Sequence, residues 1–370
     1  MDRNNDAIMS NQLYSILVTS IIGIGILSLP RALATKAGPD SLIVLLIGSI
    51  AFLIIALLME KLVMKFPRKT MIEISDSILF KPMGLIIGFI YFMYMFLITA
   101  LEVRAFAEIT KNFLLLNTPI EVIIITFLVS VAYLVRSGIE SIARLSVIVL
   151  PLSIFPAIIV MLVSIRDLDF TYFLPILRTP LPDLMNAIPQ VFFSFLGFEF
   201  ILYLGFFVKD TKNLKKTAVS TIGFISIVYF IFTAVTIARF GIAENKSLIW
   251  PVVTLFKSVD LPGTLLENVE VVIMSTWLLS VFMTVCVAYY GATFLLSRIV
   301  KSREHNYLAL FLLPLIYMLS LIPENIVQVG DYLDQYANNF GMIVGFIIPV
   351  FLFLVSFFRR KPKKGRKKNA

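Results

Sequence analysis

The sequence is poor in the side chains from which metal sites and covalent catalytic sites are usually built. It contains one cysteine, Cys286, in an apolar run, and one histidine, His305, in a polar connector. A disulfide within the chain and a thiolate metal cluster both need more than one cysteine. Ser-His-Asp catalysis needs a histidine held among its partners. We therefore expect no enzyme activity, no cofactor and no metal site.

Charged residues are also scarce, and this decides the class of protein. They make up 15% of the 370 residues, against about 25% in a typical soluble domain. Hydrophobic residues make up 59%, and the mean hydropathy is +0.94. The first apolar run follows Asp2 and Asp6 and precedes many more, which is not the pattern of a cleavable signal peptide. The composition predicts an all-α polytopic membrane protein.

A helix that crosses a bilayer needs roughly 17 to 25 apolar residues. By this measure the chain has about ten spans: 11–33, 39–63, 83–113, 119–137, 141–164, 185–208, 214–239, 265–299, 306–322 and 339–358. The third and eighth runs exceed the bilayer thickness, so these helices should tilt or project. The longest connectors, 165–184 and 240–264, should form ordered short loops or surface helices. We divide the chain into a transmembrane domain over 1–358 and a tail over 359–370.

Positive charge gathers in this tail and on one side of the predicted membrane. Arg359 to Lys368 include eight Lys or Arg and no acid. We expect the tail to bind anionic lipid, at about 1 kcal/mol per basic residue near the surface. Nucleic acid is a poor partner, because no aromatic or folded recognition element accompanies the charges. Lys and Arg are more numerous in the connectors that share a side of the membrane with the N-terminus than in those on the opposite side. The positive-inside rule therefore places both termini in the cytoplasm.

The first span is interrupted. Gly23 and Gly25 each weaken a helix by about 1 kcal/mol relative to alanine, and Pro30 ends or kinks it soon after. Backbone groups freed inside a bilayer need partners, so such a break is tolerated where it lines a cavity or is buried in protein. Close helix packing is the alternative, since glycine and proline are common in membrane helices.

The sixth span has a matching interruption. Gly197 lies near its middle and is followed by the acidic Glu199. Ten spans divide into repeats of five, over about 11–164 and 185–358, in which span 6 corresponds to span 1 and span 8 to span 3. In an inverted repeat, corresponding broken helices surround a binding site at mid-membrane. The pair of breaks therefore favours a cavity over simple packing.

The motif Gly23-x-Gly25-Ile26-Leu27-x-Leu29-Pro30 resembles the first span of amino acid/polyamine/organocation transporters, which implies a LeuT-type 5+5 inverted repeat with broken helices 1 and 6. The connector Phe66-Pro67-Arg68-Lys69-Thr70-Met71-Ile72-Glu73, followed by Lys81-Pro82-x-Gly84, resembles the B subunit of endospore germinant receptors. The resemblance covers essentially the whole chain. It implies a spore inner-membrane protein that senses a small germinant, often an amino acid, together with an A subunit and a lipoprotein C subunit.

The midpoints of spans 1, 3, 6 and 8 lie near residues 22–25, 98, 197 and 282, and an inverted repeat would place them around one cavity. The candidate ligand-binding residues are Gly23, Gly25, Ile26, Tyr94, Ile98, Glu102, Leu196, Gly197, Phe198, Glu199, Ser280 and Thr284.

We expect different roles for these residues. Backbone N–H groups near Gly23 and Gly25, at the N-terminus of a half-helix, favour a carboxylate. Glu102 is costly inside a membrane and holds either a ligand ammonium or a proton. The alternative is a local network with Arg104 and Glu108, which are four residues apart and can pair. The hydroxyl of Thr284 bonds either a ligand or its own i−4 carbonyl.

Three functions remain open. The first is the membrane subunit of a germinant receptor, and the second an autonomous amino acid transporter coupled to protons or sodium. The third is an ion or water channel without small-ligand specificity. Span 5 has no lysine at mid-depth, where proton-coupled members of the superfamily use one, and Arg144 lies near its start. A cavity without a clear coupling device suits a sensor at least as well as a pump.

Overall fold

The structure, a computed structural model, describes residues 7–23, 25–165, 168–258, 269–302 and 306–358. Apart from one isolated bridge between Ile8 and Val208, the regular elements in these residues are helical. The α-helices are α1 (Ser10–Ile21), α2 (Gly25–Ala37), α3 (Ser41–Lys65), α4 (Met71–Ile78), α5 (Lys81–Phe113), α6 (Ile120–Arg136), α7 (Ile139–Ser164), α8 (Leu181–Ser194), α9 (Ile201–Leu204), α10 (Leu214–Ser247), α11 (Pro251–Lys257), α12 (Val269–Ile299), α13 (Asn306–Ser320), α14 (Ile326–Tyr336) and α15 (Ile348–Phe358). The predicted basic tail, 359–370, lies outside the described residues.

Helices occupy all ten predicted spans. α1 with α2 forms span 1, α8 with α9 forms span 6, α14 with α15 forms span 10, and α3, α5, α6, α7, α10, α12 and α13 form the others. In the described residues six stretches are long and apolar enough to cross a bilayer, and the bent pair of α8 and α9 adds a seventh. The two long runs expected to project are α5, with 33 residues, and α12, with 31.

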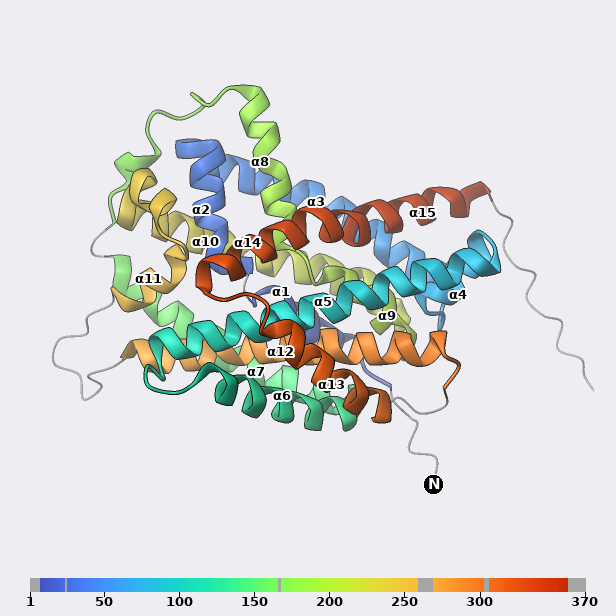
Figure 1. Cartoon of the computed structure of the whole chain (residues 1–370). Coiled ribbons are helices and arrows are strands. Elements are labelled where there is room, and N and C mark those ends of the chain that lie inside the picture. Colours follow the sequence, from blue (N-terminus) through green and yellow to red (C-terminus); the bar gives the residue numbers. More distant parts are fainter. Residues whose placement is uncertain (1–6, 24, 166–167, 259–268, 303–305, 359–370) are drawn as a thin grey trace, which may run out of the picture.

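The long helices α5 and α12 lie side by side through the centre of the bundle (Figure 1). α6, α7 and α13 pack along one side of this pair, and α2, α3, α8 and α15 lie on the other. The outer helices expose large apolar side chains, such as Ile148 (63% exposed) and Phe155 (67% exposed) on α7. In water this surface would be an aggregation liability, whereas lipid solvates it.

Two ends of the bundle can be told apart in Figure 1. The α4 end, on the right, carries α4 and the end of α15, and the α11 end, on the left, carries α11. At the α4 end the start of the described chain is fastened to the end of span 6. The amide of Ile8 donates to the carbonyl of Phe207 (3.0 Å), and that of Lys209 donates to the carbonyl of Ile8 (3.0 Å). The amide of Ser10 donates to Asp210 Oδ1 (2.8 Å).

Both predicted breaks are present, and they pack against each other. α1 ends at Ile21 and α2 begins at Gly25, while α8 ends at Ser194 and the chain bends by 49° before continuing at Phe198. Gly197 has φ +109°, a conformation that side chains rarely adopt. A Cβ atom on Gly25 would lie 3.2 Å from the carbonyl oxygen of Ser194. Glycine is therefore required by backbone conformation at one break and by close approach at the other.

Side-chain hydroxyls from two other helices satisfy the carbonyl groups freed at the breaks. The Tyr229 hydroxyl on α10 lies 3.0 Å from the carbonyl oxygen of Ile21 and 2.7 Å from that of Ser194. The Thr284 hydroxyl on α12 lies 3.0 Å from the carbonyl oxygen of Ser20. Inside a membrane such partners are what make a broken helix tolerable.

One predicted span boundary is wrong, and another span is followed by a helical stretch that was not predicted. The tenth span was expected at 339–358, but its helix begins at Ile326 and runs to Phe358 through π-helical turns at Ala337–Gly341 and Ile343–Ile347. Polar residues such as Asp331 and Asp334 lowered the hydropathy of α14 and concealed this half of the span. The seventh span ends close to its predicted bound of 239, because the helix breaks at Gly241 (φ +72°), and a second helical stretch then continues to Ser247.

The described parts of the two long connectors contain short helices, as expected. The first contains a short 3-10 helix, Phe170–Phe173, and is fastened to the turn between α2 and α3 by Asp40. The Asp40 carboxylate accepts the amide N–H groups of Leu177 (2.6 Å) and Thr179 (3.0 Å). The second contains α11, and its residues 259–264 are outside the described part.

Candidate ligand cavity

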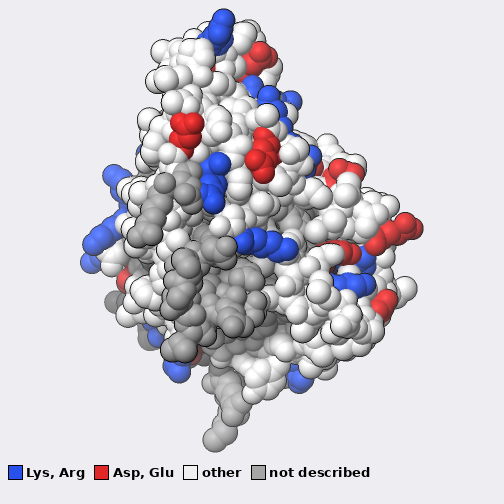
Figure 2. All heavy atoms as spheres, turned by 90° about the vertical axis from the view of Figure 1, so that its left-hand side faces the viewer, with Lys and Arg blue, Asp and Glu red and all other residues white. Residues whose placement is uncertain are grey.

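A cavity of about 580 Å³ lies between α2, α5, α8 and α14. Its deep part is formed at the helix breaks by residues such as Gly25, Gly197 and Thr284. It is also lined by the exposed side chains of Lys36 and Lys246, near the ends of α2 and α10, the helices that contact α11, and we take this part as its mouth. Figure 2 looks onto the α11 end, where basic and acidic side chains are scattered over a largely uncharged face. The cavity therefore connects the broken helices with one side of the membrane.

Eight of the twelve candidate residues line this cavity, and they come from all four expected spans. They are Gly25, Tyr94, Ile98, Glu102, Leu196, Gly197, Glu199 and Thr284.

The other four candidates lie behind the cavity wall. A Cβ atom on Gly23 would lie 2.7 Å from Thr284 Oγ1, so Gly23 backs onto that side chain. Ile26 is buried in the core (2% exposed). Phe198 packs edge-on against Phe52, with ring centroids 6.1 Å apart. Ser280 is reached through its carbonyl oxygen, 3.1 Å from the Thr284 hydroxyl. These four support the site without facing it.

The Glu199 carboxylate accepts hydrogen bonds from groups at the break in span 6. The amide N–H of Gly197 donates to both of its oxygens, at 2.8 and 3.0 Å, and the Tyr94 hydroxyl donates to Oε1 at 2.6 Å. The Tyr336 hydroxyl in turn donates to the carbonyl oxygen of Tyr94 (2.8 Å), and the two rings are stacked. This chain of bonds ties α14 to α5 and α5 to the break.

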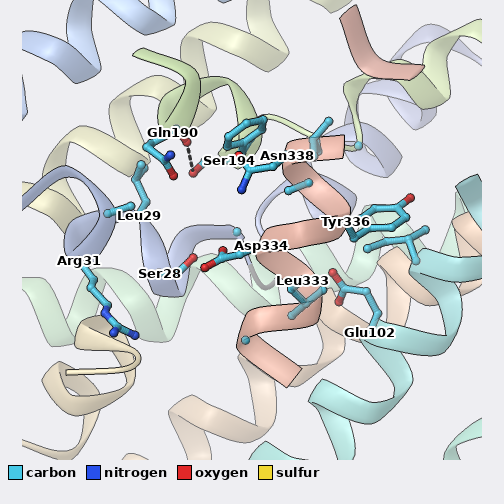
Figure 3. A pocket seen from close by; sticks show the side chains of 18 of the residues that line it. Ser28, Leu29, Arg31, Glu102, Gln190, Ser194, Leu333, Asp334, Tyr336 and Asn338 are labelled. Carbon is cyan, nitrogen blue, oxygen red and sulfur yellow. Dashed lines mark hydrogen bonds between the residues drawn. The ribbon is translucent and has the colours of Figure 1, made fainter. Parts of the chain in front are cut away.

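Glu102 is buried, at 6% exposed, and lines the cavity from α5. Its Oε2 has no hydrogen-bond partner among the described residues. Figure 3 shows its carboxylate directed toward α14, beside Leu333 and below the Tyr336 ring. Ser20 Oγ is the second cavity-lining atom that is buried and without a partner in the described structure.

The predicted pairing of Arg104 with Glu108 is confirmed, with Arg104 Nη2 2.8 Å from Glu108 Oε1. Arg104 Nη1 also lies 3.5 Å from the carbonyl oxygen of Ser320 on α13. The pair is buried, and neither residue lines the cavity. Glu102 does not belong to this pair among the described residues.

The charged side chains at the mouth were missed from the sequence. Arg31 and Lys36 on α2 lie on the cavity wall, as do Asp331 and Asp334 on α14. Figure 3 shows Asp334 extending from α14 toward α2, where Ser28 lies. The position of Arg31, directly after Pro30, could have identified it. The acidic residues belong to the half of span 10 that hydropathy did not detect.

The side chain of Leu196, at the break in span 6, packs against two glycines of span 10. A Cβ atom on Gly341 would lie 2.7 Å from Leu196 Cδ1, and one on Gly345 would lie 2.9 Å from Leu196 Cδ2. Leu196 therefore occupies a slot made by two glycines one helical turn apart. The Tyr91 hydroxyl on α5 donates to the carbonyl oxygen of Val344 (2.9 Å), within the same π-helical region. Such turns are frequent at functional sites.

Comparison with known proteins places this geometry in a family. Residues 7–329 match the family described as "Spore germination protein". The chain belongs to the spore germination protein family. It is 32% identical to spore germination protein A2 of Bacillus subtilis (strain 168) over 351 residues, which cover 94% of each chain. It is 25% identical to spore germination protein B2 of the same strain over 357 residues, 96% of each chain.

The fold of this spore germination protein is shared with a solved structure. The crystal structure of MhsT in complex with L-phenylalanine matches with a TM-score of 0.69 and 18% identity, over 90% of this chain and 87% of MhsT. At this identity the likeness shows the fold alone. The all-α membrane fold of LeuT type, with broken spans 1 and 6, is confirmed.

Proposed function

We propose that this spore germination protein is the membrane subunit of a germinant receptor, and that it binds a small germinant, an amino acid, in the cavity between the broken helices. The observation that carries the proposal is the meeting of two broken helices at a cavity that also contains unpartnered polar atoms. Such a constellation recognises a small polar ligand, because it offers fixed polar groups inside an apolar enclosure. The family match supports the setting, the spore inner membrane.

The proposal also assigns each end of the bundle to one side of the membrane. The concentration of Lys and Arg in the connectors at the α4 end supports a cytoplasmic position for that end and for both termini. The cavity mouth at the α11 end then faces outward, where a germinant arrives. The basic tail would rest on anionic lipid of the cytoplasmic leaflet. The division into two inverted repeats stays a prediction.

Binding changes the protein by favouring one arrangement of the cavity walls over another. The walls that can respond are α2, the break in span 6, and span 10, which holds Leu196 between its glycines. We propose that the resulting movement is passed to an A subunit and a lipoprotein C subunit. At the α4 end, the bonds between Ile8, Ser10 and residues 207–210 hold the first and sixth spans together.

An autonomous amino acid transporter is the second candidate, because the fold is shared with MhsT. Uptake of amino acids into liposomes by the purified chain alone would favour the transporter and contradict a role as sensor only. A chain that binds but does not transport supports the receptor. Ion flux in the absence of amino acid would instead indicate a channel.

The binding site is tested by ligand-dependent thermal stabilisation of the purified chain across the twenty common amino acids. Gly25→Leu places a bulky side chain against Ser194, and Thr284→Leu removes the hydroxyl near Ser20. Both should abolish stabilisation while the protein still reaches the membrane. Gly223→Leu on α10 is the control, because its Cβ would have nothing within 4 Å. An unchanged dose response in both variants would contradict the proposed site.

A further inference from the structure

We propose that Glu102 is the residue that binds the ammonium group of the germinant, so the ligand class is free amines. The proposal rests on the proposed function, since it assigns one contact within the same cavity. The observation behind it is that Glu102 Oε2 is buried and has no hydrogen-bond partner in the described structure, although the residue borders the cavity. A buried carboxylate without a partner is costly, and inside a membrane span it marks a functional site.

The other acceptors at the breaks already have partners within the protein. The carbonyl oxygens of Ile21 and Ser194 face the Tyr229 hydroxyl, and that of Ser20 faces Thr284. The Glu199 carboxylate, the second acid at this depth, receives the Gly197 amide and the Tyr94 hydroxyl. Of the two acids that the sequence placed at the depth of the breaks, Glu102 is therefore the free one for a ligand ammonium, while Asp331 and Asp334 line the cavity from α14.

No basic side chain of the described residues forms an ion pair with Glu102. Arg104, two residues further along α5, is engaged by Glu108 at 2.8 Å. Figure 3 shows the Glu102 carboxylate directed toward the α14 wall and Arg31 on the far side of the cavity. The Tyr336 ring lies near the carboxylate but is stacked on Tyr94, so the carboxylate itself is the group available to a cation. The unpaired carboxylate is therefore the group to which we assign the ammonium ion.

The experiment uses the purified full-length chain, with the twenty common L-amino acids and their N-acetyl derivatives as probes of thermal stabilisation. The wild type should be stabilised by at least one free amino acid and not by its N-acetyl form, which has no ammonium. Glu102→Gln should shift the midpoint concentration at least about tenfold, which corresponds to about 1.4 kcal/mol. Glu102→Asp, which keeps the charge, should bind more tightly than Glu102→Gln.

Glu60→Gln is the matched control, since Glu60 is also a buried acid (5% exposed) but lies on α3 and does not line the cavity. Its midpoint should equal that of the wild type. Without ligand, Glu102→Gln should melt no lower than the wild type, because it removes an unpaired buried charge. A residue with a purely structural role would show the opposite, a lower melting temperature with unchanged midpoints.

Three other outcomes of this experiment would overturn the assignment of Glu102. Equal midpoints for wild type and Glu102→Gln overturn the assignment of the ammonium and leave the proposed cavity intact. Loss of stabilisation by sodium ions alone, with amino acid midpoints unchanged, makes Glu102 a metal-cation site and overturns the proposal as well. If none of the twenty amino acids stabilises the wild type, the proposed function fails and the assignment fails with it.

Discussion

The side chain of Leu196 lies where a side chain on Gly341 would have to be, with only 2.7 Å between Leu196 Cδ1 and a Cβ at that position. The contact joins the break in span 6 to the π-helical part of span 10. Because Leu196 also lines the cavity, a substitution at Gly341 that displaces Leu196 should change the shape of the cavity.

Gly341→Ala should therefore weaken both stability and ligand binding. Overpacking of a filled space costs about 1–3 kcal/mol, and relief requires Leu196 to move. The melting temperature and the ligand midpoint of the purified chain measure the two effects. Adding Leu196→Ala should restore part of the lost stability, since the two positions are in contact and their effects are not additive. Gly223→Ala is the control, and a double variant no better than Gly341→Ala alone would contradict the contact.

Tyr229→Phe should loosen both broken spans at once. Its hydroxyl shares one proton between the carbonyl oxygens of Ile21 and Ser194, and its removal leaves these buried acceptors without that donor, which costs about 1–3 kcal/mol. We expect a lower melting temperature and faster hydrogen exchange near residues 20–25 and 194–200. Tyr133→Phe, on the exposed face of α6 (78% exposed), should leave both unchanged. Exchange increased at only one of the two breaks would show that the hydroxyl does not bridge them.

The sequence allowed the helical spans and both breaks to be predicted, because apolar length and glycine position act locally along the chain. It also identified eight of the residues that line the cavity from spans 1, 3, 6 and 8, since depth in the membrane follows from position within a span. It did not identify α14. There, acidic side chains such as Asp331 and Asp334 line the cavity, so the average hydropathy no longer reports burial in the membrane.

The rotation of each helix about its own axis, which decides which side chains face the cavity, could not be predicted from the sequence either. Ser280 and Thr284 share a face of α12, yet only Thr284 reaches the cavity, because the space beside Gly23 admits its hydroxyl. Which of two equivalent positions faces a ligand depends on the neighbouring helix, and periodicity carries no information about that neighbour. The slot for Leu196 between Gly341 and Gly345 was missed for the same reason.

Arg104→Met should be strongly destabilising, while the double change Arg104→Met with Glu108→Leu should be much milder. The single change leaves the Glu108 carboxylate buried and unpaired, at a cost of about 3–5 kcal/mol, whereas an apolar replacement of the whole pair is often neutral. Melting temperatures measure both. The exposed pair of Glu140 and Arg144 on α7 is the control, since Arg144→Met should cost at most about 1 kcal/mol.

The same variants separate structure from binding. Because neither Arg104 nor Glu108 lines the cavity, the folded double variant should keep the ligand midpoint of the wild type. A large shift in that midpoint would show that the pair positions Glu102, its neighbour on α5, and is more than a structural contact.

The fastening at the α4 end should depend on pH through Asp210. Burial raises the pKa of Asp210, but the hydrogen bonds that it accepts from Asn213 and Ser10 outweigh this and hold the pKa below its ordinary value. A carboxyl group whose pKa is lower in the folded state contributes stability above its unfolded pKa, about 3.9, and loses it as the pH falls through the folded value.

Asp210→Asn, which keeps an acceptor oxygen but removes the charge, should therefore melt at a lower temperature than the wild type near neutral pH. The difference should shrink as the pH falls below about 4, the ordinary range of an aspartate. Melting curves of both proteins across this pH range measure it, and hydrogen exchange at residues 8–13 reports whether the α4 end opens. Glu121→Gln, an exposed acid in the first turn of α6, is the control. A difference that grows on acidification would show that Asp210 does not act through its charged form.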